Sequence, residues 1–213
     1  VVRHQRILAG MLLEVQYEIF NYLRMLKSGS LGAKDVQEVL HFVINRFSPS
    51  MEEQLLSCGE EERVARLFRL LNRPLRVCGM VVNRGEPGGG PFWVKDDSGR
   101  LSLQVVEQAE IDKGSPEQEA ILASSTHFSP VQIVCGLRDF QGQPFDLKHF
   151  VDPEAVFVSR KTEDGKELKA LELPGLWNGG MAYWNTMFVE IPEETFNPVK
   201  SINDLLRPGH VTT

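Results

Sequence analysis

The apolar residues of the chain change their period near Pro74, and this change constrains the fold more than any other feature of the sequence. Before Pro74, apolar side chains recur every three or four residues, as they do in amphipathic helices. After it come short runs rich in β-branched and aromatic residues, bounded by Gly, Pro and Asp. We therefore expect an α/β protein, with a helical segment over residues 1–72 packed on a mixed β-sheet formed within residues 73–213.

Four helices are predicted in the first segment. The first carries an apolar residue at every fourth position and ends near Gly29. These residues are Ile7, Met11, Val15, Ile19 and Leu23, and the apolar stripe is widened by Leu8, Leu12, Phe20 and Leu26. A second helix is predicted from Ala33 to Phe47. Ser50 and Glu53 have the spacing of a capping box for a short third helix, and the run EEERVARLFRLLNR predicts a fourth that ends before Pro74.

Six strands and one further helix are predicted in the second segment. The strand runs are RVCGMVVN, PFWVKD, LSLQVVE, VQIVCGL, AVFVSRK and TMFVEIP, and DDSG between the second and third is typical of a hairpin turn. The run SPEQEAILA predicts a helix with Ser115 as its N-cap and Pro116 in its first turn.

Composition and charge exclude several functional classes. The 213 residues carry a formal net charge of −6 and no basic stripe, so nucleic acid is not an expected partner. No apolar run reaches the ~20 residues of a membrane span. Three scattered cysteines indicate reduced thiols and a cytoplasmic location. The chain starts without methionine, so we expect a fragment of a larger protein.

The common motifs of nucleophilic and metal-dependent catalysis do not occur. The sequence contains no Gly-x-Ser-x-Gly, His-Glu-x-x-His or Cys-x-x-Cys, and its five histidines are dispersed. No metal site is predicted within this chain.

Two stretches are candidates for binding a ligand. In GEPGGGPFW, from Gly85 to Trp93, the glycines allow a ligand to approach the backbone closely, although the same stretch also suits a wide turn. In LQVVEQAEID, Glu107 ends a strand, where a carboxylate can accept hydrogen bonds from sugar hydroxyls. The alternative for Glu107 is a solvated strand end.

Two further stretches suit stacking and anion binding. In LPGLWNGGMAYWNTMFVEIP, Trp177 and Asn178 lie on a Gly-rich loop and could stack on and bond to a sugar or base, although Trp177 and Trp184 could equally fill the core. In NPVKSINDLL, Lys200 precedes a helix capped by Ser201, where an anion is stabilised. The alternative for Lys200 is an exposed lysine after a turn.

Taken in order, these stretches resemble the C-terminal half of nucleotide-sugar pyrophosphorylases, of the type that acts on UDP-N-acetylglucosamine and UDP-glucose. The matching runs are VCGMVVNRGEPGGGPFWV, VVEQAEID, HFSPVQIVCGL and TFNPVKSINDLL. The runs EPGGGPFW, LPGLWNGGM and TFNPVK also resemble a bacterial family known as a domain of unknown function, and that resemblance covers nearly the whole chain.

The pyrophosphorylase resemblance implies a role for individual residues. It implies that Lys200 contacts the phosphates of a nucleotide sugar and that Glu107 holds sugar hydroxyls. It also implies that the backbone of Gly89 or Gly90 faces the sugar. The sugar-binding asparagine of the family falls at Ser129, and its motif arginine falls at Thr195, so both contacts are altered here.

The same resemblance implies a nucleotide-diphospho-sugar transferase-like fold and a reaction. In the intact protein, sugar 1-phosphate and a nucleoside triphosphate would give a nucleotide sugar and pyrophosphate, with Mg²⁺ held by residues outside this chain. The expected partners are a nucleotide sugar or sugar phosphate and a missing N-terminal half, so this chain alone should be inactive. The alternatives are a non-catalytic sugar- or nucleotide-binding module and a structural protein.

Overall fold

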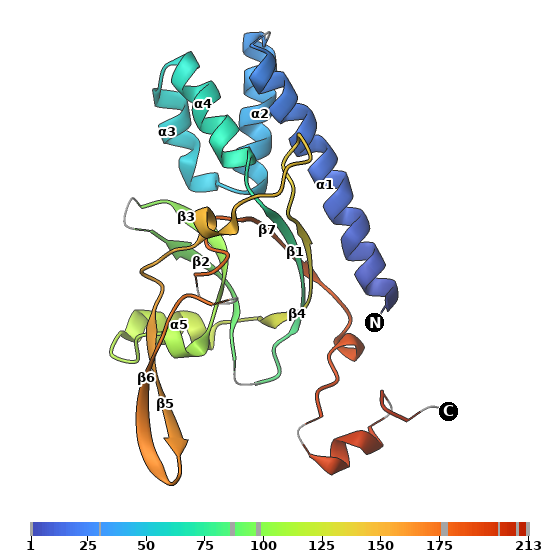
Figure 1. Cartoon of the computed structure of the whole chain (residues 1–213), viewed down its shortest axis with the longest axis vertical. Helices are drawn as coiled ribbons and strands as arrows, with labels where there is room; N and C mark the ends of the chain where they lie inside the picture. Colours follow the sequence, from blue (N-terminus) through green and yellow to red (C-terminus); the bar gives the residue numbers. More distant parts are fainter. Residues whose placement is uncertain are drawn as a thin grey trace.

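The computed structural model describes residues 2–29, 31–85, 88–96, 99–175, 179–199, 201–207 and 209–211, apart from the Ser129 side chain. Four N-terminal helices form one layer, and the strands lie below them (Figure 1). The helices are α1 (Val2–Ser28), α2 (Ala33–Arg46), α3 (Glu52–Ser57), α4 (Glu60–Leu71) and α5 (Pro116–Ala123). The strands are β1 (Leu75–Val82), β2 (Gly90–Lys95), β3 (Leu101–Val106), β4 (His127–Gly136), β5 (Phe157–Glu163), β6 (Lys166–Glu172) and β7 (Asn185–Glu190).

The five short 3₁₀ helices lie between these elements or near the C-terminus. They are η1 (Pro49–Met51), η2 (Gln108–Glu110), η3 (Leu147–Phe150), η4 (Glu193–Thr195) and η5 (Ile202–Leu206). None of the helices that the structure describes combines the length and the apolar character needed to cross a membrane.

Helix α1 buries most of the predicted apolar stripe. Its buried residues, Leu8, Leu12, Val15, Ile19, Leu23 and Leu26, were all predicted, whereas Ile7, also predicted, is 48% exposed. A strict four-residue spacing drifts by about 40° per step around a helix of 3.6 residues per turn, so alternating steps of three and four follow one face better. The predicted end of the helix is correct, because Gly29 has φ +68°, the left-handed conformation typical of a residue after a helix.

The main sheet is small and mixed, with β1 in its centre. Strand β1 pairs antiparallel with β4 and parallel with β7, giving the order β4-β1-β7. The fold class is therefore confirmed: N-terminal helices pack on a mixed sheet. Gly79 of β1 faces α1, where a Cβ would lie 3.0 Å from Leu8 Cδ1 and even closer to Ile191. A glycine there allows helix and sheet to approach closely.

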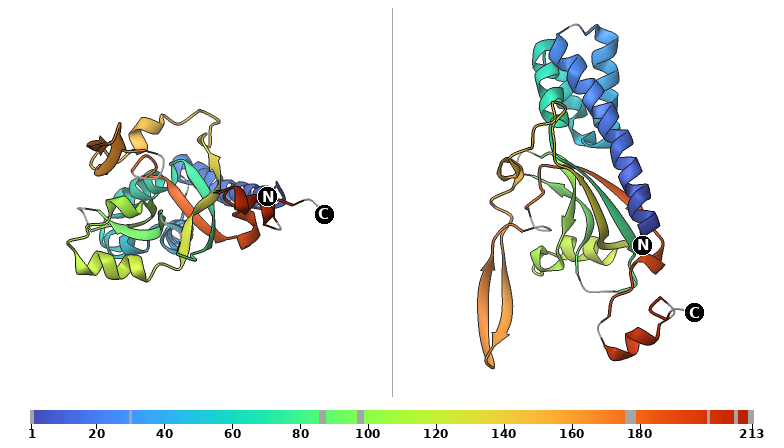
Figure 2. Two further views of the ribbon diagram at one scale, coloured as in Figure 1. Left: turned by 90° about the horizontal axis from the view of Figure 1, so that it is seen from below. Right: turned by 45° about the vertical axis from the view of Figure 1, so that its right-hand side comes forward.

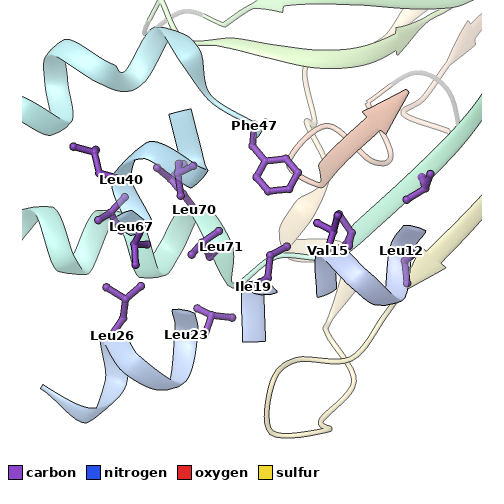
Figure 3. Close-up of a cluster of buried hydrophobic side chains, with 14 of the residues drawn as sticks. Leu12, Val15, Ile19, Leu23, Leu26, Leu40, Phe47, Leu67, Leu70 and Leu71 are labelled. Carbon is purple, nitrogen blue, oxygen red and sulfur yellow. The ribbon is translucent and has the colours of Figure 1, made fainter. Parts of the chain in front are cut away.

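One cluster of buried side chains joins the helices to the sheet. Figure 3 shows Leu23 and Leu26 of α1 facing Leu40 of α2 and Leu67 of α4. Alternate residues of β1 extend the same cluster along α1; these are Leu75, Val77 and Val81. The cluster therefore crosses the boundary near Pro74 where the sequence changes its period.

Two antiparallel hairpins accompany the sheet. Strands β2 and β3 form the hairpin predicted from DDSG, closed where the Asp96 N–H donates to the Arg100 carbonyl oxygen (3.0 Å). Strands β5 and β6 form a second hairpin that extends away from the rest of the molecule (Figure 2). The sequence did not predict β6, because KELKALE is rich in charged residues and its strand conformation depends on pairing with β5.

The predicted capping box at Ser50 is wrong. Ser50 lies inside η1, and α3 begins two residues later with Met51 as its N-cap and no side-chain capping bond. The Ser50 hydroxyl instead accepts a hydrogen bond from the Leu101 N–H (2.8 Å), which ties the helical layer to the start of β3. A tertiary contact replaces the local one that the spacing suggested.

Candidate functional site

A cavity of about 320 Å³ lies between the loop after β1, the start of β2 and the end of α5. Its lining comes from three stretches of the sequence: residues 83–92, Gln108 and residues 122–125. The lining residues are Asn83, Gly85, Gly88, Gly89, Gly90, Phe92, Gln108, Leu122, Ala123 and Ser125. The volume is at the lower end of the ~300–1,000 Å³ typical of small-molecule sites.

Two glycines of the loop are required by close packing. Gly88 has φ +151°, and a Cβ there would lie 2.9 Å from Cε2 of the Phe128 ring. At Gly90 a Cβ would lie 3.0 Å from the His127 carbonyl oxygen and 3.2 Å from the Ser125 hydroxyl. The loop can therefore pass against β4 and the end of α5, and its backbone forms one wall of the cavity.

The described lining is polar but uncharged. It offers two side-chain amides, Asn83 and Gln108, and the hydroxyl of Ser125. The Asn83 Oδ1 accepts from the Gly85 N–H (2.8 Å), which leaves the amide NH₂ as a donor. Phe92 and Leu122 supply apolar surface. This combination suits a neutral ligand with several hydroxyl groups better than it suits an ion.

Glu107 adjoins the cavity without being among its lining residues. Gly90 pairs with Val106, and the Gln108 N–H donates to the Gly88 carbonyl oxygen (3.2 Å), so Glu107 lies opposite Gly89. Burial raises the pKa of Glu107, and its carboxylate has no ion-pair partner among the described residues.

Glu110, in the same motif, has a structural role. Its Oε2 accepts from the Glu107 N–H (2.7 Å) and so closes the turn of η2. Burial is also the main cause that raises the pKa of Glu110, with a further contribution from the nearby Glu107 carboxylate. Glu110 therefore closes a turn, whereas the Glu107 carboxylate is not held by an ion pair among the described residues.

The structure brings only part of the predicted site together. Gly89 and Gly90 line the cavity, and Glu107 lies next to it. Trp177, Asn178 and Lys200 lie outside the described residues, and of Ser129 only the backbone, within β4, is described. The roles assigned to these four residues stay predictions.

The segment before Lys200 lies beside the glycine-rich loop. The Arg84 guanidinium pairs with the Glu193 carboxylate (3.2 Å), and the rings of Phe128 and Phe196 are 5.1 Å apart. Because the Phe128 ring also packs against Gly88, residues 193–196 are tied to the loop from two directions.

The local argument for an anion at Lys200 is weakened by the structure. The helix after Ser201 is a five-residue 3₁₀ helix, η5, too short for a strong dipole. The Asp204 carboxylate accepts from the Ser201 N–H (2.7 Å) and hydroxyl (3.1 Å), so an internal anion already occupies this helix start. Any role of Lys200 in binding phosphate must rest on the family resemblance instead.

Sequence reasoning missed three polar residues of the cavity: Asn83, Gln108 and Ser125. They follow β1, β3 and α5 respectively, and no motif links positions so far apart. The signal that could have indicated them is their shared placement at element ends, where binding residues concentrate. Within the described ranges, no group of three or more His, Cys, Asp or Glu side chains is placed to hold a metal ion.

Fold and cavity together define a mixed α/β protein with a small cavity whose described lining is rich in glycine and carries no charged side chain. The chain belongs to the DUF4301 family, described as a domain of unknown function, whose model matches residues 1–211. The expected membership of a family of unknown function is thereby confirmed. No curated protein matches the chain.

A solved structure with distant similarity is that of a UDP-glucose pyrophosphorylase mutant from Leishmania major in complex with UDP-glucose. The two chains share 17% identity over 71% of this chain, with a TM-score of 0.37. The match covers 34% of that enzyme, so this chain spans about a third of its length. A TM-score at this level carries no argument about function.

Proposed function

We propose that the chain binds the sugar moiety of a nucleotide sugar or sugar phosphate, as the sugar-side portion of a sugar nucleotidyltransferase. The observation that carries the proposal is the cavity beside the glycine-rich loop, whose described lining is polar but uncharged. A sugar ring presents hydroxyl groups that both donate and accept, which amides, a hydroxyl and backbone groups satisfy without charge.

The surroundings of the cavity fit a sugar in two further respects. The Phe92 ring offers an apolar surface for the C–H face of a sugar ring. Glu107 lies next to the cavity and has no ion pair within the described part of the chain. It offers a carboxylate that accepts from two hydroxyls, as the pyrophosphorylase resemblance implies.

The phosphate end of the ligand would lie toward the C-terminal segment. Glu193 pairs with Arg84, which precedes the glycine-rich loop, and Phe196 packs on Phe128, whose ring lies against Gly88. These contacts support this direction, because Lys200 follows four residues after Phe196. In the proposed reaction a phosphate oxygen of the sugar 1-phosphate forms a bond to the α-phosphorus of the triphosphate, and pyrophosphate leaves. Lys200 would neutralise charge on the phosphates, and Mg²⁺ bound by residues outside this chain would neutralise charge on the triphosphate.

A non-catalytic binding module is the second candidate, and Thr195 favours it. The pyrophosphorylase motif has an arginine at this position, where Thr195 brings no charge. Its hydroxyl donates to the Pro192 carbonyl oxygen (2.7 Å) and so serves the local turn of η4. A protein that keeps the sugar cavity but lacks this charge can bind without turnover.

The cavity is tested by blocking it from the surface. Ala123 is exposed and lines the cavity at the end of α5, whereas Ala120 is exposed on the same helix but does not line it. We expect calorimetry to show binding of UDP-glucose, UDP-N-acetylglucosamine or glucose 1-phosphate to the wild type and to Ala120→Phe, and loss of binding in Ala123→Phe. Absence of binding to the wild type, or equal loss in both variants, would refute the sugar site.

A second measurement separates the two candidate functions. Lys200→Ala should weaken binding of a UDP-sugar about ten- to a hundredfold, since a charge-assisted hydrogen bond contributes ~1.5–3 kcal/mol. Release of pyrophosphate by the intact protein, given nucleoside triphosphate and sugar 1-phosphate, would support the transferase. Binding without this release would support the module.

A further inference from the structure

A second, much smaller cavity lies beneath the helical layer, where the chain leaves α4 and where β3 and β7 begin (Figure 1). Its volume of about 10 Å³ is room for about one water-sized group. It shares no lining residue with the sugar cavity. The residues that matter here are Ser48, Arg73, Arg100, Ser102, Trp184 and Thr186.

Two arginines approach this cavity, and only one of them has an acidic partner. The Arg100 Nε donates to the Asp96 carboxylate (3.0 Å). The Arg73 Nε donates to the Arg69 carbonyl oxygen (3.1 Å), and no ion pair to Arg73 occurs among the described residues. Burial, together with the neighbouring Arg100 charge, lowers the pKa of Arg73 to about 10. The cavity therefore holds more positive than negative charge.

An independent observation concerns Trp184, which lines the same cavity. The residue is only 7% exposed, and its Nε1–H finds no hydrogen-bond partner in the part of the chain that the structure describes. An indole N–H can only donate. Because a buried donor without an acceptor is costly, this group requires an acceptor that the described protein groups do not supply.

A third arginine does not line the cavity but bonds to a residue that does, and it adds to the positive electrostatic potential there. Arg76 of β1 is 1% exposed, and its Nε donates to Oγ1 of Thr186, a lining residue (2.8 Å). Among the described residues its other acceptors are the sulfur of Met181 and Oε1 of Gln104, both neutral. Positive charges in a partly buried, low-dielectric site attract an anion more strongly than charges in water do.

We propose that this cavity is a binding site for a phosphate group. One phosphate oxygen enters between Arg73, Arg100 and the Trp184 N–H, and the other oxygens lie at the mouth, where both arginines are partly exposed. Donors from three separate elements suit a tetrahedral dianion, whereas a planar carboxylate is matched by one forked guanidinium. The site is separate from the sugar cavity and does not depend on the proposed function.

The test uses the Trp184 indole N–H as its reporter. Spectra of the ¹⁵N-labelled chain are recorded while inorganic phosphate, or acetate at the same ionic strength, is added, and the Trp184 signal is assigned with Trp184→Phe. We expect phosphate to shift this signal to saturation and acetate to shift it much less. No saturable shift with phosphate, or an equal response to acetate, would overturn the proposal.

Matched variants then test the arginines. Arg73→Gln should weaken phosphate binding about ten- to a hundredfold, as expected for the loss of a charge-assisted contact. Arg69→Gln removes the same charge from an exposed position on α4 and should leave binding nearly unchanged, because Arg69 does not line the cavity. An equal loss in both variants would mean that phosphate responds to net charge alone, and would refute the site. If a variant folds poorly, the phosphate titration of the wild type still tests the proposal.

Discussion

Replacing Arg76 by methionine should leave the protein as stable as the wild type or more stable, whereas replacing it by alanine should destabilise it. Arg76 lies in the central strand, 1% exposed, and no carboxylate among the described residues pairs with it. Burial accordingly lowers the pKa of its guanidinium. The residue holds a charge in a place where charge is unfavourable.

The expected magnitudes follow from its contacts. Methionine fills a similar volume but leaves Thr186 Oγ1 and Gln104 Oε1 without the Arg76 donor, at a cost of about 1 kcal/mol each. Against this stands the desolvation of the charge, several kcal/mol for a buried ion. The net change for Arg76→Met should lie between zero and a gain of about 4 kcal/mol. Arg76→Ala also opens a cavity and should be about 2–5 kcal/mol less stable than Arg76→Met.

Urea unfolding followed by circular dichroism measures both differences, with equal m-values as the check that the unfolded states are comparable. Arg69→Met, at an exposed position on α4, is the control and should change the free energy of unfolding by less than about 0.5 kcal/mol. If Arg76→Met lost as much stability as Arg76→Ala, the guanidinium would have a favourable charge partner, and the reasoning from an unpaired buried arginine would fail.

Two further predictions concern Glu107 and Ser50. Burial raises the pKa of Glu107 above its usual 4.5, because the folded protein disfavours the charged carboxylate. The stability that the protonated Glu107 side chain contributes is therefore greatest below pH 4.5 and is lost as the pH rises through the raised pKa. Glu107→Gln should therefore melt at a higher temperature than the wild type at pH 7 and at the same temperature at pH 3; a constant difference across this range would contradict the prediction. Ser50→Ala removes the acceptor of the Leu101 N–H and should lower the free energy of unfolding, measured in urea, by about 1–3 kcal/mol. The control is Ser57→Ala, which should lower it less because the exposed Ser57 hydroxyl bonds only within its own helix turn.

The helices could be predicted because their signals are local. The apolar stripe, the Gly29 stop and the Ser115 cap act within a turn or two of the chain, and the structure has a helix at each predicted place. The one cap that failed, Ser50, failed because a hydroxyl can bond to a distant strand as easily as to its own helix. Strand β6 failed for a related reason, since its conformation depends on a partner strand.

The candidate sites were predictable only where their residues form a contiguous motif. The run GEPGGGPFW indicated the glycine-walled cavity, and VVEQAEID indicated Glu107 beside it. No motif in the sequence pointed to the arginines of the second cavity. Nothing in the sequence indicated that Arg73, Arg100 and Trp184 would meet, because they lie on three segments far apart in the chain.

By itself the sequence determined the helical first third, the change to strands at Pro74 and the family of the chain. These features follow from the period of the apolar residues and from the turn-forming residues, and both signals depend on residues that are close in sequence. Only the tertiary structure decided which polar groups share a cavity, which carboxylate of VVEQAEID closes a turn, and which buried donors lack an acceptor. Those outcomes depend on strand pairing and helix packing between distant segments. Polar groups that these contacts bury together share a low-dielectric environment, which strengthens the electrostatic interactions among them.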